Sequence, residues 1–356
     1  MNDKNLMNHA ADNIRILAVS MVEKAKSGHP GGAMGGADFI NVLFSEFLVY
    51  DPNNPEWEGR DRFYLDPGHM SPMLYAVLAM QGKYTIDELK QFRQWGSITP
   101  GHPERDIKHG IENTSGPLGQ GHTYAVGAAI AEKFLEARLS HTMMQHKIYA
   151  YISDGGIQEE ISQGAGRIAG LLHLDNLIMF YDANEIQLST ECDVVMSEDT
   201  KMKYQAWGWN VLEINGNDPD EIRDALKKAN EEKTRPTLII GHTIMGKGAI
   251  KGDGTSYERN VNTHGAPLGH DSYVNTVKNL GGDIDNPFVI FDDVKELYEN
   301  RRKELLEIVG KRHQEENKWR EANSETAKLM DKWFSGKAPQ VDWSSVTQQR
   351  DVATRV

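Results

Sequence analysis

Two short apolar runs, each followed by a polar residue at a turn, most constrain what this chain can fold into. The first run covers residues 147–152 and stops before Asp154, and the second covers residues 176–181 and stops before Asn184. Both are rich in β-branched and aromatic residues, which is typical of buried parallel strands. Because open α/β sheets bind ligands at the carboxyl ends of adjacent strands, we expect Asp154 and Asn184 to share one site.

The residues at these two strand ends match the needs of a hard cation. Mg²⁺ and Ca²⁺ prefer about six oxygen ligands, and the Asp154 carboxylate, the Asn184 amide oxygen and a backbone carbonyl near Ile186 would supply half of them. Phosphate oxygens and water would complete the shell. Backbone N–H groups at Gly155 and at the start of a helix expected over residues 157–172 would take more phosphate charge. The alternative, that these are only turn residues, stays open for this pair alone, since Asp, Asn and Gly dominate turns.

Composition excludes several classes of partner. The formal net charge is −13, and the acidic residues are dispersed, which argues against a nucleic-acid surface. An anionic ligand must therefore be held locally. The single cysteine, Cys192, excludes an internal disulfide and fits a reducing compartment. The sequence shows neither a signal peptide nor an apolar stretch of about eighteen residues, so we expect a cytoplasmic protein with no membrane partner.

Alternating strand and helix patterns predict an α/β fold, a doubly wound parallel sheet flanked by helices. Further strands are expected at residues 62–65, 209–214 and 237–240. Helices are expected at residues 14–25, 39–47, 71–81, 86–95 and 219–233. The long irregular stretch between residues 96 and 121 is expected to be functional.

The last part of the chain differs in composition from the rest. From residue 292 to about 334 it is charged and helical, which is typical of a solvated helix, and from Ser335 onward it is polar. We therefore expect an α/β domain over residues 1–290, followed by a helical arm and linker over residues 291–356.

Several histidines lie next to glycine, which lets an imidazole approach a small polar ligand closely. They are His29, His69, His102, His122 and His264. This repeated setting indicates a pocket, although His122, like His109 and His270, is interpreted as an ordinary surface or loop histidine.

Two glycine-rich segments imitate nucleotide-binding loops. In residues 241–248, Gly248 stands where a nucleotide-binding loop has a Ser or Thr whose hydroxyl reaches Mg²⁺. Nucleoside triphosphate binding is therefore not expected at this segment. Gly164 and Gly166 fall inside an expected helix rather than at its start, so helix packing through small residues is the better interpretation.

Taken together, these motifs resemble transketolase, in the same order and at similar spacing from near the amino terminus to the end of the chain. The matching segments are residues 27–31, 99–104, 116–121 and 264–269, with Asp154-Gly155 and Asn184 between them. Transketolases use thiamine diphosphate with Mg²⁺ or Ca²⁺ to move a two-carbon ketol unit from a ketose phosphate to an aldose phosphate. The resemblance also implies their thiamine diphosphate-binding (PP-module) fold.

The resemblance assigns roles residue by residue. It implies a metal bound by Asp154, Asn184 and the carbonyl of Ile186. It implies a cofactor lined by His69, Gly116, Pro117, Leu118, Gly155, Asn184 and His264. The residues facing the sugar would be His29, His102 and His264, and Glu159 would be the family acid after the Asp-Gly pair. Imidazoles suit this chemistry, because the cofactor stabilises the carbanion and the protein must supply positioning and proton transfer near neutral pH.

Four residues depart from the family pattern, and one module is missing from the resemblance. The departures are Ser153, Ala183, Glu160 and Gly164, the last of which puts a proton relay between paired sites in doubt. A pyrimidine-binding module, expected in a second chain or in a missing C-terminal half, would complete the enzyme as a homodimer or heterotetramer acting on sugar phosphates. The arm and linker favour a fragment over a natural split subunit. Alternatives are a ketol transferase with a different sugar substrate and a catalytically silent cofactor-binding module.

Overall fold

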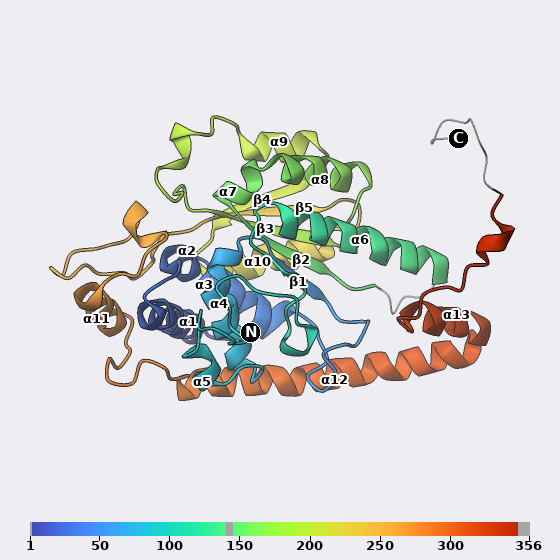
Figure 1. Ribbon diagram of the computed structural model, residues 1–356, viewed down its shortest axis with the longest axis horizontal. Coiled ribbons are helices and arrows are strands. Elements are labelled where there is room, and N and C mark those ends of the chain that lie inside the picture. Colours follow the sequence, from blue (N-terminus) through green and yellow to red (C-terminus); the bar gives the residue numbers. More distant parts are fainter. Residues whose placement is uncertain (1, 140–144, 348–356) are drawn as a thin grey trace. The chain divides into compact units, whose positions relative to one another are not determined.

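Five parallel strands form one sheet at the centre of the computed structural model, which describes residues 2–139 and 145–347. They are β1 (Arg62–Leu65), β2 (Ile148–Ser153), β3 (Leu177–Ala183), β4 (Asn210–Asn215) and β5 (Thr237–His242), in the order β1-β2-β3-β5-β4 (Figure 1). Because β2 and β3 are neighbours and Ser153 pairs with Asp182, their carboxyl ends lie at the same edge. The predicted parallel α/β sheet is confirmed.

Helices cover both faces of the sheet (Figure 1). One layer contains α1 (Lys4–Ala25), α3 (Ala37–Val42), α4 (Ser71–Met80) and α10 (Pro219–Glu231), and the other contains α6 (Gln120–Leu139), α8 (Glu160–Leu171) and α9 (Thr200–Ala206). Side chains alternate along a strand, so Tyr149 and Tyr151 of β2 pack into the first layer while Ile148, Ala150 and Ile152 pack into the second.

Local sequence signals set several helix ends. The Asp3 carboxylate caps α1 by accepting from the backbone N–H of Asn5 at 2.9 Å, and Lys26 ends the helix in a left-handed conformation. Helix α10 begins with Pro219 after an Asp218 cap, a combination that favours helix starts. The remaining helices are α2 (Pro30–Gly35), α5 (Ile86–Leu89), α7 (Asp154–Gln158), α11 (His270–Asn279), α12 (Asp292–Ala322) and α13 (Ser324–Phe334).

The structure corrects some expected helices. The helix predicted over residues 86–95 ends at Leu89, because Arg93 adopts a positive φ of 60° and its N–H bonds the Thr99 carbonyl. The helix expected from residue 157 instead begins at Asp154 and is interrupted at Glu159, whose ψ is 135°. Helices α6, α9 and α11 were not predicted.

Glycines of α8 pack closely against a neighbouring segment. A Cβ on Gly166 would lie 3.0 Å from the Trp207 ring, and one on Gly170 would lie 1.8 Å from the Trp207 carbonyl oxygen. The interpretation of this glycine-rich segment as helix packing is therefore confirmed for Gly166, whereas Gly164 faces open space.

Contacts divide the chain into two units, residues up to 312 and residues from 313 onward. The first unit includes the beginning of α12, whose Val294 and Leu305 are buried and whose Tyr298 hydroxyl donates to Asn41 at 2.9 Å. Within the second unit, Arg320 and Asp331 form an ion pair of 2.8 Å. The boundary at residue 290 stays a prediction, and the chain end at residues 351–356 lies outside the described residues.

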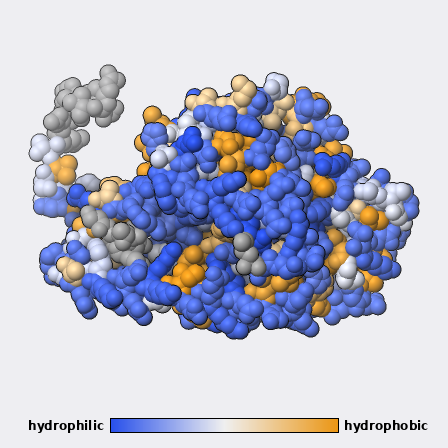
Figure 2. Space-filling model, turned by 180° about the vertical axis from the view of Figure 1, so that it is seen from behind, coloured by the Kyte–Doolittle hydropathy of each residue, from blue (hydrophilic) through white to orange (hydrophobic). Residues whose placement is uncertain are grey.

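The surface of the molecule is largely hydrophilic. Figure 2 shows apolar side chains in separate patches on the face turned away from the viewer in Figure 1. Within the described ranges, no helix combines the length and the apolar character needed to cross a membrane.

Candidate active site

A cavity of about 240 Å³ lies at the carboxyl ends of β2 and β3. Of the site residues expected from the sequence, it brings together His29, His69, Leu118, Asp154, Gly155, Asn184, Ile186 and His264. The two strand ends therefore converge on one concave site, which is the usual location of ligands in open α/β sheets.

The Asp154 carboxylate is buried and held from several sides. One oxygen accepts a hydrogen bond from the Tyr181 hydroxyl at 2.5 Å, and the other accepts from the backbone N–H groups of Asn184 at 3.2 Å and Glu185 at 3.0 Å. The Asn184 side-chain oxygen accepts from the Ile186 N–H at 3.1 Å. Glu185 has a φ of 66°, a conformation that costs energy for a residue other than glycine and that turns the loop toward Asp154.

Burial dominates the electrostatics of this corner. Burial raises the pKa of Asp154 to about 7, the Tyr181 hydrogen bond opposes the rise, and the nearby charge of Asp182 adds to it. Asp182 lies behind the cavity, accepting hydrogen bonds from Thr243 and from the Tyr151 hydroxyl, and burial raises its pKa to about 6. The described lining of the cavity includes no lysine or arginine to balance these carboxylates, and a divalent ion would supply that charge.

Three imidazoles surround the other side of the cavity. The ring centroid of His29 lies 5.0 Å from that of His69 and 5.8 Å from that of His264, and His69 and His264 are 5.4 Å apart. Burial, followed by repulsion from His264, lowers the pKa of His29 to about 4 and lowers the pKa of His69 well below its ordinary value. Burial also lowers the pKa of His264. All three rings are therefore neutral at pH 7.

Two glycines in or next to the cavity lining allow close packing. A Cβ on Gly31 would lie 2.5 Å from the Met245 sulfur and 2.6 Å from the Thr263 carbonyl oxygen, so only glycine fits there. A Cβ on Gly155 would lie 3.0 Å from Leu118. This close packing explains why a glycine stands two residues after His29.

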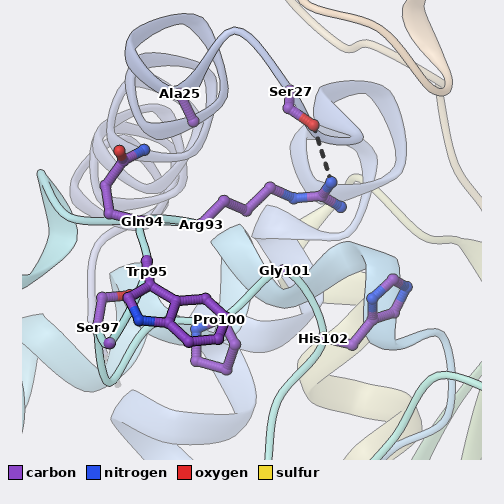
Figure 3. A pocket seen from close by; sticks show the side chains of 10 residues that line it. Ala25, Ser27, Arg93, Gln94, Trp95, Ser97, Pro100, Gly101 and His102 are labelled. Carbon is purple, nitrogen blue, oxygen red and sulfur yellow. Dashed lines mark hydrogen bonds between the residues drawn. The ribbon is translucent and has the colours of Figure 1, made fainter.

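Four of the expected residues do not line this cavity. His102 lines a more open pocket of about 620 Å³ with Arg93, whose guanidinium donates to the Ser27 hydroxyl at 2.9 Å (Figure 3). Gly116 lies beside His102, since a Cβ added to Gly116 would lie 3.8 Å from the His102 ring. Pro117 follows it in the chain. Glu159 is exposed at the start of α8.

Other residues of the cavity were not singled out from the sequence. Gln187, Leu188 and Met245 line it, and Tyr181 orients Asp154. Tyr181 stands at the end of a predicted strand and could have been found from that position. Met245 lies in the glycine-rich segment at residues 241–248, so that segment contributes to this cavity by packing.

The residues present fit a metal with an anionic diphosphate. The lining residues described for this cavity include no lysine or arginine, so a diphosphate needs a counter-cation. In the described part of the chain, no three His, Cys, Asp or Glu side chains are arranged to hold a metal, which leaves Asp154 with amide and carbonyl oxygens as the available oxygen set. Buried Nδ1 atoms of His29 and His264 have no hydrogen-bond partner among the described residues and could serve a ligand.

Known proteins match most of this chain. The family model described as "Transketolase, thiamine diphosphate binding domain" matches residues 6–339. Transketolase 1 of Pasteurella multocida is 45% identical over 266 residues, covering 73% of this chain and 39% of that protein. The transketolase of Staphylococcus epidermidis is 39% identical over 341 residues, covering 93% of this chain and 50% of that protein.

Solved structures agree with these matches. Transketolase from Leishmania mexicana superimposes with a TM-score of 0.86 at 36% identity, covering 91% of this chain and 49% of that chain. Transketolase from Campylobacter jejuni superimposes with a TM-score of 0.83 at 39% identity, covering 93% of this chain and 50% of that chain. The chain spans about half the length of the relatives it matches, or less. From this match and from the shared fold, the chain belongs to the transketolase family, in which it corresponds to the thiamine diphosphate binding domain.

Proposed function

We propose that this chain supplies the diphosphate- and metal-binding half of a transketolase, which transfers a two-carbon ketol unit from a ketose phosphate to an aldose phosphate. The observation that carries the proposal is the convergence of Asp154 and Asn184 on a cavity that also holds three neutral imidazoles. Relatives that are named transketolase and that match up to 93% of this chain support it.

The residues of the cavity divide into metal-binding and cofactor-binding groups. Asp154, Asn184 and the Ile186 carbonyl would hold Mg²⁺ or Ca²⁺, and His69, Leu118, Gly155 and His264 would line the cofactor, with Gly116 and Pro117 next to them. When bound, thiamine diphosphate supplies the electron sink that breaking a carbon–carbon bond next to a carbonyl requires.

The histidines would position the sugar and move protons. Because His29 and His264 are neutral at pH 7 and have unpartnered Nδ1 atoms, each can accept a proton from a substrate hydroxyl or hydrogen-bond its oxygen. His102, whose pKa is lowered by burial and then by Arg93, would meet the sugar from the open pocket (Figure 3). A cavity rather than an open surface would shield these transfers from bulk solvent.

Activity is proposed to need a pyrimidine-binding module, from a second chain or from a C-terminal half. Exposed apolar side chains on α6 and α8 support association, because large apolar surfaces commonly mark interfaces. These side chains are Tyr124, Phe134, Ile161, Ile168 and Leu171. Glu159 is exposed at the start of α8, where an associated module could reach it. We propose a homodimer or heterotetramer in the cytoplasm.

Calorimetric titration tests this function. Thiamine diphosphate is titrated with Mg²⁺ into this chain, with and without the pyrimidine-binding module of a transketolase, and ketol transfer is assayed in parallel. We expect metal-dependent cofactor binding, little transfer by the chain alone, and transfer once the module is added. Full activity of the chain alone would contradict the need for a partner.

A catalytically silent cofactor-binding module is the second candidate, favoured by the departures around Asp154. The structure accommodates one of them, since the Ser153 hydroxyl accepts from the Gly156 N–H at 3.4 Å and caps α7. In the reconstituted enzyme, His29→Ala and His264→Ala should each lower turnover by about 100-fold or more. Unchanged turnover in both variants would favour the silent module, and a panel of sugar substrates would identify a related ketol transferase.

A further inference from the structure

A third cavity, of about 400 Å³, opens at the other end of the sheet, where β2 and β3 begin. Its lining comes from the segments before these strands, from α6, from the end of α10 and from α12. The proposed function uses none of these residues. Four basic residues line this cavity in a chain whose net charge is −13, and these are Lys133, Lys147, Lys233 and Arg312.

Three of these cations have no carboxylate partner among the described ion pairs. The Lys147 ammonium donates to the backbone carbonyl of Asp175 at 2.9 Å. The Lys233 ammonium donates to the backbone carbonyl of Asn230 at 3.1 Å, and the Arg312 guanidinium donates to the carbonyl of Gly59 at 3.2 Å. By contrast, Lys133 is paired with the Asp175 carboxylate at 2.8 Å. A neutral carbonyl leaves most of a cation's charge available to an anion.

The two other carboxylates facing the cavity offset this charge only in part, and Asp61 acts on both Arg312 and Lys147. Asp61 is buried, and its oxygens accept the backbone N–H groups of Val49 at 2.9 Å and Lys147 at 2.8 Å. Glu132 accepts a hydrogen bond from the Asn176 amide, and burial raises its pKa to about 7, so roughly half of the molecules carry it protonated at neutral pH.

The two lysines also lie close enough to repel each other. Burial lowers the pKa of Lys147, and the nearby positive charge of Lys233 lowers it further. An anion between the two ammonium groups would remove this repulsion and replace the water lost on burial. Among the other polar groups on the wall, the Tyr149 hydroxyl and the Asn230 side-chain oxygen are joined to each other at 3.2 Å, Gln145 bonds Glu136 and His146 bonds Arg62.

We propose that this cavity binds an oxyanion of the phosphate class, free or as a phosphate monoester, through Lys147, Lys233 and Arg312. A tetrahedral phosphate fills only part of a cavity of about 400 Å³, so the cavity has room for an organic substituent. The proposal is independent of ketol transfer, because the site is built from residues outside the cofactor cavity.

Thermal unfolding with inorganic phosphate tests the proposal, with sodium chloride at equal ionic strength as the reference. Phosphate should raise the midpoint of the wild-type chain above the chloride reference, because a ligand that binds only the folded state stabilises it. Lys233→Gln should weaken phosphate binding about tenfold, and the double variant Lys147→Gln/Lys233→Gln should abolish the rise. Lys233 is exposed, so its substitution leaves the packing intact.

The matched control is Lys201→Gln, which removes an exposed lysine that pairs with Glu213 at 2.8 Å away from this cavity. It should keep the full response to phosphate. An equal rise in the double variant, or no rise in the wild type beyond the chloride reference, would overturn the proposal.

Location and ligand class are tested directly by diffraction and by a second ligand. Anomalous scattering from selenate-soaked crystals should place the anion between Lys147 and Lys233, and a selenate found only elsewhere overturns the assignment. Tighter binding of glycerol 3-phosphate than of inorganic phosphate would assign the cavity to a monoester, and weaker binding would assign it to the free anion.

Discussion

The two ends of β2 and β3 carry opposite charge imbalances. At the carboxyl ends, the buried Asp154 faces a cavity without lysine or arginine and with neutral imidazoles. At the amino ends, Lys147 and Lys233 face a cavity whose carboxylates offset its four cations only in part, since Asp175 pairs with Lys133 and the pKa of Glu132 is about 7. The charge that the protein leaves uncompensated therefore indicates the ligand, a cation with its diphosphate at one end and an anion at the other. The count of charged residues alone would not have shown this difference.

The largest expected effect comes from Asp154→Asn, which removes the uncompensated charge at the carboxyl end. Metal-dependent binding of thiamine diphosphate should fall by more than about 100-fold, since a direct metal ligand matters at least as much as its hydrogen-bond partners. The variant should nevertheless be at least as stable to unfolding as the wild-type chain. The amide can still accept from the Asn184 and Glu185 N–H groups while its NH₂ donates to the Tyr181 hydroxyl.

The sign of the stability change follows from proton binding. Because the folded-state pKa of Asp154, about 7, lies above its ordinary 3.8, the wild-type chain loses stability as pH rises between these values. The advantage of Asp154→Asn should therefore appear above about pH 4 and be complete above about pH 7. Calorimetric titration and thermal unfolding measure both effects, with the exposed Asp193→Asn as the matched control. Retained metal binding in Asp154→Asn would refute the proposed metal site.

A smaller effect is expected from pH in the wild-type chain. The metal competes with the proton on Asp154, so apparent Mg²⁺ affinity should fall by about tenfold per pH unit below about pH 7 and level off above it. His29, with a pKa of about 4, contributes little above pH 5.5. Titrations between pH 5.5 and 8.5 in phosphate-free buffer measure the slope. A flat profile would mean that Asp154 is already ionised without the metal.

Sequence predicted the carboxyl end of the sheet far better than the amino end. Asp154 and Asn184 follow two strand-like runs, and parallel pairing alone brings such residues together. The cations at the amino end come from distant segments, since Lys147 precedes β2, Lys233 follows α10 and Arg312 lies in α12. No local pattern links them, and only the tertiary structure brings them to one cavity.

Helix prediction failed where packing or backbone geometry overrides local pattern. Helix α6 carries apolar residues on its exposed face, including Tyr124 and Phe134, so it lacks the clear amphipathic period that identifies a surface helix. The early end of α5 goes with the left-handed backbone conformation of Arg93, which no sequence pattern predicts. That turn places Arg93 in the open pocket beside His102, so the missed turn also concealed a residue of the candidate site.

The role of Tyr181 separates orientation from ligation at the carboxyl end. Tyr181→Phe removes the hydroxyl that donates to Asp154 at 2.5 Å and should raise the pKa of Asp154 further, because that hydrogen bond lowers it. We expect about tenfold weaker Mg²⁺ binding and a metal-binding profile displaced to higher pH. Tyr204→Phe, at a buried tyrosine outside the cavity, should leave both unchanged. Equal effects of the two variants would assign the loss to packing.

The smallest expected effect tests the charge balance at the amino end. The folded-state pKa of Glu132, about 7, exceeds its ordinary 4.5, so the wild-type chain should lose stability relative to Glu132→Gln as pH rises between these values. The difference in unfolding midpoint at pH 8 should be only a few degrees, ~2–4 °C.

Glutamine keeps an oxygen for the Asn176 amide, so packing is preserved, and Glu299→Gln, at an exposed glutamate of α12 that does not line the cavity, serves as the control. Glu132→Gln should also bind inorganic phosphate more tightly than the wild type at pH 8, because it removes a negative charge from the lining of the cavity, near Lys133. If instead stability and phosphate binding are the same in both chains at every pH, Glu132 does not govern the local charge. The excess of cations at this end of the sheet must then be set by Lys147, Lys233 and Arg312 against Asp61 alone.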